Sequence, residues 1–191
     1  MRYILICLVL LLSSAFVCAD DIVTMPTANQ LKGGQVDLAA YYLGLQMPDG
    51  APQHVSYQTL YVGLTDKFEL DAHLSDVNKD SSSTVLVGSY KLLSENRVTP
   101  DLVFGCRNIA GVATTINPAV RENSQDRSYY VSAAKTFFFN PAAPGAPLVR
   151  VHLSAGTADW TLLGAERHKG LFGGLQFLLR PDIGAIIEND E

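Results

Sequence analysis

Three side chains capable of acid–base chemistry or metal binding alternate along one short stretch of the chain. Glu69, Asp71 and His73 are two residues apart, so they share one face if the stretch is a β-strand. Carboxylates and imidazoles are zinc ligands, which makes a metal site the most specific function that this spacing could indicate. The polar face of any amphipathic strand gives the same string, however, and Arg150 and His152 repeat it with a cation. The sequence therefore predicts no metal site.

Motifs with a known catalytic mechanism are missing from the sequence. It contains no G-x-S-x-G, no H-E-x-x-H, no P-loop and no C-x-x-C. Gly170, Gly173 and Gly174 lie within an alternating apolar segment and not between a strand and a helix, so they are not a dinucleotide-binding loop. We therefore expect a protein that is not an enzyme, with no catalytic, cofactor-binding or metal-binding residues.

The elements that position these side chains are expected to be long β-strands. Apolar and polar residues alternate over about 9 to 12 positions, and Gly, Pro, Asn, Asp and Ser separate the runs. The mean strand of a soluble protein has about 5 to 6 residues, whereas a membrane-spanning strand needs about 9 to 11. The predicted strands are 35–46, 54–64, 67–77, 83–93, 100–109, 127–139, 147–156, 168–179 and 182–188.

The alternation assigns residues to two faces. A two-residue turn at Asp66 and Lys67 would pair Tyr61 with Ala72, and paired residues share a face. This register predicts a charge-free face of Val55, Tyr57, Thr59, Tyr61, Gly63, Phe68, Leu70, Ala72 and Leu74. It predicts an opposite face of Ser56, Gln58, Leu60, Val62, Leu64, Glu69, Asp71, His73 and Ser75. A slip by one residue would exchange the two faces of a strand.

Charged side chains gather on the polar face. In a soluble sheet this face would be the solvated surface, and in a membrane barrel it would line the interior while the apolar face contacts lipid. Alternation alone does not separate the two, but the strand lengths and the secretory signal peptide predicted at residues 1–19 favour the barrel. Lys135 fits poorly, because it shares its strand face with Val131 and Phe137. The residues predicted to line the lumen are Asp37, Glu69, Asp71, His73, Lys91, Arg107, Lys135, Arg150 and His152.

The first residues have the parts of a secretory signal peptide. Arg2 is the positive n-region, residues 4–12 are an apolar run, and Val17 and Ala19 are small residues before a cleavage site at Asp20. The alternative is a retained membrane anchor, for which the run is short. We divide the chain into a signal peptide (1–19), an N-terminal extension (20–34) and a β-barrel domain (35–191).

The charge and cysteine content of the exported chain exclude some functions. The loss of Arg2 with the signal leaves 13 of 14 basic residues against 19 acidic ones, a net charge of −6. Nucleic acid binds basic surfaces, so it is not an expected partner. Cys7 and Cys18 leave with the signal, and Cys106 alone cannot form an intrachain disulfide. The stability of the fold must come from a buried core or from a membrane.

Several stretches resemble bacterial outer-membrane β-barrel proteins. The stretch "VSYQTLYVGLTDKFELDAHL" (55–74) is similar to the strand, tight turn and strand unit of those barrels. The stretches "MPTANQLKGGQVDLAAYY" (25–42), "RSYYVSAAKTF" (127–137) and "GLFGGLQFLLRPDIGAIIEND" (170–190) resemble one branch of them, the exopolysaccharide-associated exported barrel family (YjbH-like). The resemblance covers most of residues 25–190. It implies an outer-membrane location, with outer-membrane lipid and the barrel-assembly machinery as partners.

We therefore expect an all-β, antiparallel up-and-down meander of about 9–10 long strands that forms a complete or incomplete transmembrane β-barrel. Nine strands is an odd number, and the chain ends in "IIENDE" without the terminal aromatic residue that the resemblance implies. A truncated product, a gene fragment, a self-associating half-barrel and a miscounted strand stay open as alternatives. The expected function is structural or transport- and export-associated, linked to exopolysaccharide. The alternative is a secreted or periplasmic soluble β-barrel or sandwich that binds a small apolar ligand with its charge-free face turned inward.

Overall fold

The computed structural model describes residues 26–46, 52–77, 81–111, 115–117, 120–122, 127–139, 146–157, 160–162, 165–167, 169–180 and 183–189. The predicted signal peptide and the start of the predicted extension lie outside these residues. All regular elements of the described residues are β-strands. No helix in these ranges is long and apolar enough to cross a membrane.

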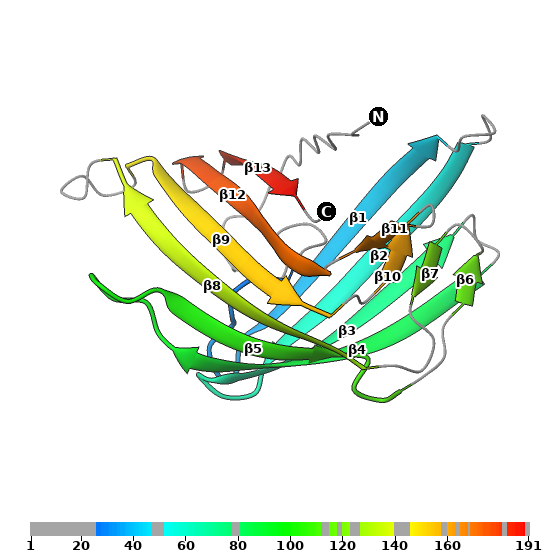
Figure 1. The fold of residues 1–191 in the computed structure, drawn as a ribbon, viewed down its shortest axis with the longest axis horizontal. Coiled ribbons are helices and arrows are strands. Elements are labelled where there is room, and N and C mark those ends of the chain that lie inside the picture. The colour runs from blue at the N-terminus through cyan, green and yellow to red at the C-terminus, as the bar shows by residue number, and fades with distance from the viewer. Residues whose placement is uncertain are drawn as a thin grey trace.

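Nine strands form one antiparallel sheet in which neighbours along the chain are also neighbours in space (Figure 1). Their order is β1-β2-β3-β4-β5-β8-β9-β12-β13. The strands are β1 (Val36–Gln46), β2 (Pro52–Gly63), β3 (Phe68–Val77), β4 (Ser81–Leu93), β5 (Asp101–Arg107), β8 (Ser128–Phe138), β9 (Leu148–Gly156), β12 (Gly170–Arg180) and β13 (Ile183–Asn189). Each coincides with one of the nine predicted strands, so the predicted all-β meander is confirmed.

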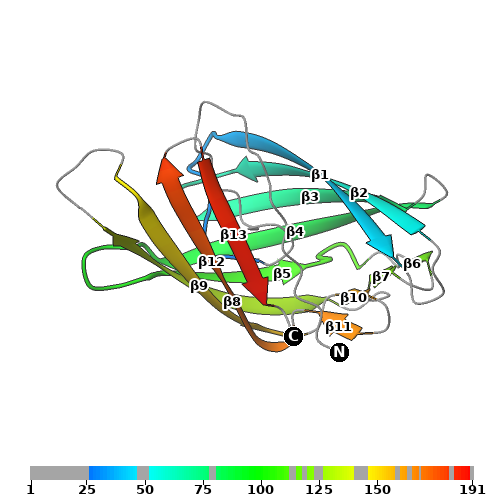
Figure 2. The ribbon, with the colours of Figure 1, turned by 90° about the horizontal axis from the view of Figure 1, so that it is seen from above.

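The sheet is open. Within the described residues, β1 pairs only with β2 and β13 only with β12, so these two strands are its edges. The nine strands curl around a common interior, as the two perpendicular views in Figures 1 and 2 show. Right-handed strand twist accumulates across a sheet of this width and produces such a curl.

The register between β2 and β3 corrects the predicted one by one residue. Tyr61 pairs with Asp71, not with Ala72, and Gly63 pairs with Glu69. The connection is longer than a two-residue turn, because the backbone N–H groups of Leu64 and Thr65 both donate to the carbonyl oxygen of Phe68, at 2.9 and 3.1 Å. The faces of β2 are therefore exchanged relative to the prediction. Leu60, Val62 and Leu64 share a face with Phe68, Leu70, Ala72 and Leu74, whereas Thr59, Tyr61 and Gly63 share one with Glu69, Asp71 and His73.

The two faces of the sheet differ in burial. We call the face that bears Glu69, Asp71 and His73 the inner face, and the face that bears Leu70, Phe104 and Val131 the outer face. Large apolar side chains on the outer face are exposed, including Phe104, Val131 and Leu153. Buried polar side chains of the inner face are Thr59, Glu69, Asp71, His73, Ser89, Asp101, Arg107, Ser128, Ser132, His152 and Ser154. The inner face also buries apolar side chains, among them Val87, Val103 and Phe172. The sheet nevertheless buries many polar groups and exposes large apolar ones, which is the inverse of a soluble sheet.

Two segments that lie between predicted strands, 110–126 and 157–167, contribute strands that pair with each other in a second, small sheet. Its strands are β6 (Thr115–Asn117), β7 (Val120–Glu122), β10 (Trp160–Leu162) and β11 (Ala165–Arg167), in the order β11-β10-β7-β6. The central ladder joins β7 to β10, and β6 lies against β3 and β4 (Figure 1). The long β5–β8 and β9–β12 connections are therefore joined to each other at one end of the large sheet.

The chain before β1 crosses the inner face. Residues 26–31, which we call the strap, include Thr27, Ala28 and Leu31, all buried. The strap then turns into β1, with the N–H of Gln35 donating to the carbonyl oxygen of Lys32 at 3.0 Å. Gly34 has a φ of 83° in this turn, a backbone conformation that residues other than glycine rarely adopt. Part of the predicted N-terminal extension is thus packed inside the curl of the sheet.

Candidate functional site

The acidic and histidine residues of β3 lie side by side on the inner face. Glu69, Asp71 and His73 are 0, 1 and 2% exposed. The hydroxyl of Thr59 is 3.3 Å from Nδ1 of His73, and the ring of Tyr61 meets the imidazole edge-on with the centroids 6.0 Å apart. Glu69 accepts the backbone N–H of Leu31 from the strap at 2.5 Å. This stretch therefore holds polar groups inside the fold and does not present them to solvent.

The inner face also holds the other predicted lumen residues of the central strands. Arg107 of β5 is buried and pairs in register with Val87 and Ser128, which are buried too. His152 of β9 is buried and pairs with Ala134 and Gly174. Both positions agree with the predicted assignment of these side chains to the polar face.

Asp37 lies toward the edge of the same face. It pairs with Tyr61, which sets its side chain on the inner side of β1. It is only partly buried, and its Oδ1 accepts the N–H of Leu38 at 2.9 Å. Asp37 therefore shares the predicted face but lies outside the buried interior.

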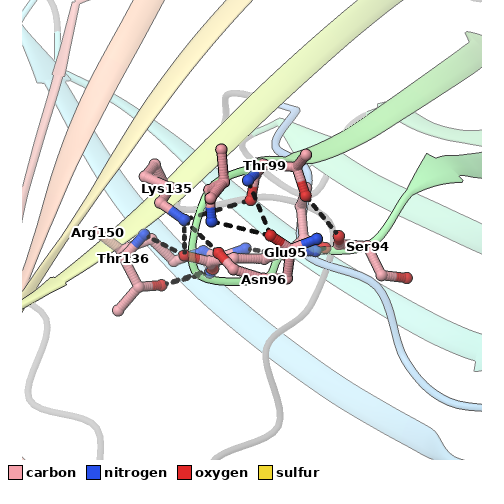
Figure 3. Close-up of polar contacts among 9 residues, drawn as sticks. Ser94, Glu95, Asn96, Thr99, Lys135, Thr136 and Arg150 are labelled. Atoms are coloured by element: carbon pink, nitrogen blue, oxygen red, sulfur yellow. Dashed lines mark hydrogen bonds and ion pairs between the residues drawn. The ribbon is translucent and has the colours of Figure 1, made fainter.

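A charged cluster lies where β4, β5, β8 and β9 meet the loop of residues 94–100 (Figure 3). The guanidinium of Arg150 bridges two carboxylates, with Nη1 at 2.7 Å from Oε2 of Glu95 and Nη2 at 2.6 Å from Oδ2 of Asp101. Nη1 also donates to the hydroxyl of Thr136 at 2.7 Å. Two charge-assisted contacts from one planar group fix its position strongly. Arg150, which is on β9, therefore connects the loop to β5 through Asp101 and to β8 through Thr136.

Glu95 is the centre of this cluster and was missed by the sequence reasoning. Its carboxylate accepts the N–H and the hydroxyl of Thr136, at 2.7 and 2.8 Å, in addition to Arg150. Its own N–H donates to Oδ1 of Asp101 at 2.8 Å. The loop position of Glu95 breaks the alternation that identified the other residues, so no pattern in the sequence marked it. Asp101, which also contacts Arg150, was not among the predicted lumen residues.

The pKa of Glu95 is lowered by these contacts. Burial by itself would raise the pKa, but the backbone N–H and hydroxyl of Thr136 lower it, and so does the guanidinium of Arg150. The hydrogen bonds and the positive charge outweigh burial, because all of them favour the ionised carboxylate. Glu95 is therefore held as an anion inside the cluster.

The two predicted lumen lysines lie at the border of this cluster. Lys91 is on the inner face, in register with Val103, and its ammonium is 3.7 Å from Oδ1 of Asp101. Lys135 pairs with Val151, so its register position is on the face opposite to that of Arg150. Its ammonium nevertheless reaches the cluster. It donates to the carbonyl oxygens of Asn96 and Thr99, at 2.5 and 3.2 Å, and lies 3.5 Å from Oε1 of Glu95. A long, flexible side chain near a strand end can reach the adjacent loop in this way.

The described part of the inner face offers no cluster of metal ligands. Among the described residues, no three side chains of His, Cys, Asp or Glu gather closely enough to hold an ion. Comparisons of the chain with protein-family models, with curated proteins and with solved structures give no match. The arrangement itself is a polar, mixed-charge interior that a backbone segment fills, with an apolar exterior.

Proposed function

We propose that this protein is an outer-membrane β-barrel protein with a structural or export-associated role. The observation that carries the proposal is the inverted polarity of the sheet. Leu74, Phe104 and Leu153 are 46, 42 and 53% exposed on the outer face, whereas Glu69, Asp71 and His152 are at most 2% exposed on the inner face. Soluble proteins rarely expose large continuous apolar surface, and transmembrane barrels need an apolar exterior around a polar interior.

The soluble alternative required the opposite arrangement. A barrel or sandwich that binds a small apolar ligand encloses its apolar face and exposes its polar face. Here Phe104 and Val131 point outward, and the interior contains Glu69, Arg107 and His152. The described residues therefore favour lipid, not an enclosed ligand, as the environment of the apolar face.

The position of the aromatic residues gives independent support. Exposed rings gather at the strand ends nearest the 64–67 and 94–100 connections. Phe68 begins β3 and pairs with Tyr90, and Phe137 lies at the end of β8 with Phe139 just past it. Tyr129 lies near the opposite end of β8. Transmembrane barrels carry aromatic girdles at the two membrane interfaces.

The open edges set a condition on how such a barrel closes. With nine antiparallel strands, β1 and β13 run in the same direction. Unpaired backbone groups are not tolerated in lipid, so in a membrane these edges need partners. A second copy in the same membrane orientation would set β13 beside β1 in parallel, unlike every ladder in this sheet. Closure by one further strand that runs opposite to both edges preserves the antiparallel pattern, so we favour it over self-association.

The proposed link to exopolysaccharide rests on the resemblance together with the character of the interior. Hydroxyl, carboxylate, guanidinium and imidazole groups line the inner face, as in pores that pass polar solutes. Such groups suit a hydroxyl-rich polymer better than an apolar compound.

Membrane fractionation and a heat-modifiability gel test the proposal. The protein, expressed with residues 1–19 in a bacterium with two membranes, is expected in the outer-membrane fraction. It should need detergent for extraction. Where a further strand closes the sheet, it should also migrate faster unheated than boiled, because a closed barrel stays compact in detergent. A chain that is soluble and monodisperse without detergent would overturn the proposal.

A further inference from the structure

We propose that the strap, residues 26–31, is an internal plug that closes the polar interior of the curled sheet to solutes. The strap is held at both of its ends and packed at its centre by residues of six different strands, β2, β3, β4, β5, β8 and β9, as the following contacts show. A segment that served only as a leader to β1 would need none of them.

One end of the strap is held by a pair of serines. The hydroxyls of Ser132 on β8 and Ser154 on β9 each lie 3.1 Å from the carbonyl oxygen of Pro26, and 2.7 Å from each other. Each hydroxyl has one proton, so two of these three contacts are hydrogen bonds at any moment. The serines pair directly across the β8–β9 ladder, and both are buried. Together they satisfy a carbonyl group that would otherwise be orphaned in the interior.

The other end of the strap is held by β3 and β4. Glu69 accepts the N–H of Leu31, and the side-chain amide of Gln30 donates to the hydroxyl of Ser89, both at 2.5 Å. A hydrogen bond to a buried carboxylate is stronger than one between neutral groups. The fully buried Glu69 is thus used to hold the backbone of this segment.

The sheet is shaped to receive the strap at Gly63. A Cβ atom at this position would collide with the carbonyl oxygen of Lys32 and would lie 3.0 Å from Cβ of Leu31. The backbone of residues 31–32 can therefore approach β2 closely only because residue 63 has no side chain. This contact lies just past the strap, where the chain turns into β1.

The centre of the strap completes the apolar part of the interior. Ala28 is fully buried and belongs to one cluster with Val85, Val87, Val103, Tyr130 and Ala134. Removal of the strap would uncover these side chains and the polar groups beside them. The strap covers the interior of the fold in detergent as well as in a membrane, so this closure does not depend on the proposed function. The effect of the strap on passage through a pore does rest on the proposed function.

A buried cysteine reports whether the strap seals the interior. Val103, fully buried in the cluster with Ala28, is replaced by Cys in mature protein that also carries Cys106→Ser, and its reaction with a hydrophilic maleimide is timed in mild detergent. The parent should react slowly. The double variant Ser132→Ala with Ser154→Ala should speed the reaction on the order of tenfold, because its closed strap lacks about one or two hydrogen bonds. Gly63→Ala should have a similar effect, because the added Cβ clashes with the closed strap's junction to β1.

Two matched variants control for general loosening. Ser128→Ala removes a buried hydroxyl from the same face of β8 but leaves the contacts of the Pro26 carbonyl unchanged. Gly88→Ala adds a Cβ whose nearest atoms lie at 3.8 Å, an ordinary contact. Both should label at the parental rate. Thermal unfolding checks that each variant is folded, and the serine pair replaces Gly63→Ala if that variant does not fold. Parental labelling in the strap variants, or equal acceleration in the controls, overturns the plug.

The plug and the membrane proposal can fail separately. Accelerated labelling in a protein that never reaches the outer membrane supports the plug and sinks the membrane function. In protein that does insert, the serine-pair variant should admit a small sugar into proteoliposomes faster than the parent, and the Ser128→Ala variant should not. Inserted protein with unchanged sugar entry and unchanged labelling sinks only the plug.

Discussion

Single side chains in the interior are held by charge and hydrogen bonds more than by apolar contact. Arg150 illustrates this, because one guanidinium contacts Glu95, Asp101 and Thr136 within 2.7 Å. The loop that supplies Glu95 is organised by Asn96, whose Oδ1 accepts the N–H groups of Val98 and Thr99, at 2.8 and 3.0 Å. A polar network of this kind specifies the position of a loop only when its members are satisfied together.

The lowered pKa of Glu95 predicts how the loop responds to acid. The ionised carboxylate stabilises the fold above the unfolded-state pKa of about 4.3, and this stabilisation is lost as the pH falls through the lower folded-state pKa. Glu95→Gln should therefore melt below the wild type at neutral pH, and the difference should shrink as the pH falls below about 4. Melting curves of both proteins from neutral pH to pH 3 measure it. A difference that grows on acidification would contradict the role of Glu95.

At the scale of strands, glycine residues allow large side chains of a neighbouring strand to pack closely against the backbone. Gly105 of β5 pairs with Tyr130 of β8, and a Cβ at Gly105 would collide with the tyrosine ring. Gly105 therefore provides the space in which Tyr130 lies flat against β5, inside the cluster that the strap completes. The stacked pair of Phe104 and Tyr129, 6.2 Å between centroids, lies one residue away on the outer face.

Gly105→Ala should destabilise the protein because the added methyl group displaces the Tyr130 ring. Overpacking of this kind costs about 1 to 3 kcal/mol. Gly88→Ala, on the neighbouring strand β4, should be nearly neutral because its Cβ would have room. Denaturant unfolding in detergent compares the two variants with the parent. Equal stability of all three proteins would show that the ring relaxes freely.

At the scale of the whole molecule, the choice between lipid and water depends on the outer face. Leu153 lies in the middle of β9 and is 53% exposed, whereas Phe139 lies just past the end of β8. In a bilayer these positions would be near the core and near the interface, respectively. In water both would be ordinary surface sites.

A charge on the outer face distinguishes the two environments. In a membrane, Leu153→Arg should cost about 2 to 4 kcal/mol and Phe139→Arg at most about 1 kcal/mol, because the cost falls toward the interface. In water both changes should stay within about 0.5 kcal/mol. Unfolding titrations in lipid vesicles, with the parent as the reference, measure the difference. Equal, small effects of the two substitutions would exclude a membrane-spanning role for this face.

The sequence by itself determined the strands and, for most of them, their two faces. Alternation with period two depends only on neighbouring residues along one strand, so the faces of β3 and β9 were assigned correctly from local pattern. Glu69, Asp71, His73, Arg107, Arg150 and His152 were recognised as polar-face residues for the same reason.

Only the tertiary structure decided which face is inside and what fills it. The register of Tyr61 depends on the backbone of the 64–67 turn, because a turn that is one residue longer or shorter shifts every pair between β2 and β3. The pairing of β7 with β10 joins segments that are far apart in the chain. Glu95 enters its cluster through a loop without periodicity. The strap lies on the inner face because Ser132, Ser154 and Glu69 converge there from distant strands, and no local pattern encodes such a meeting.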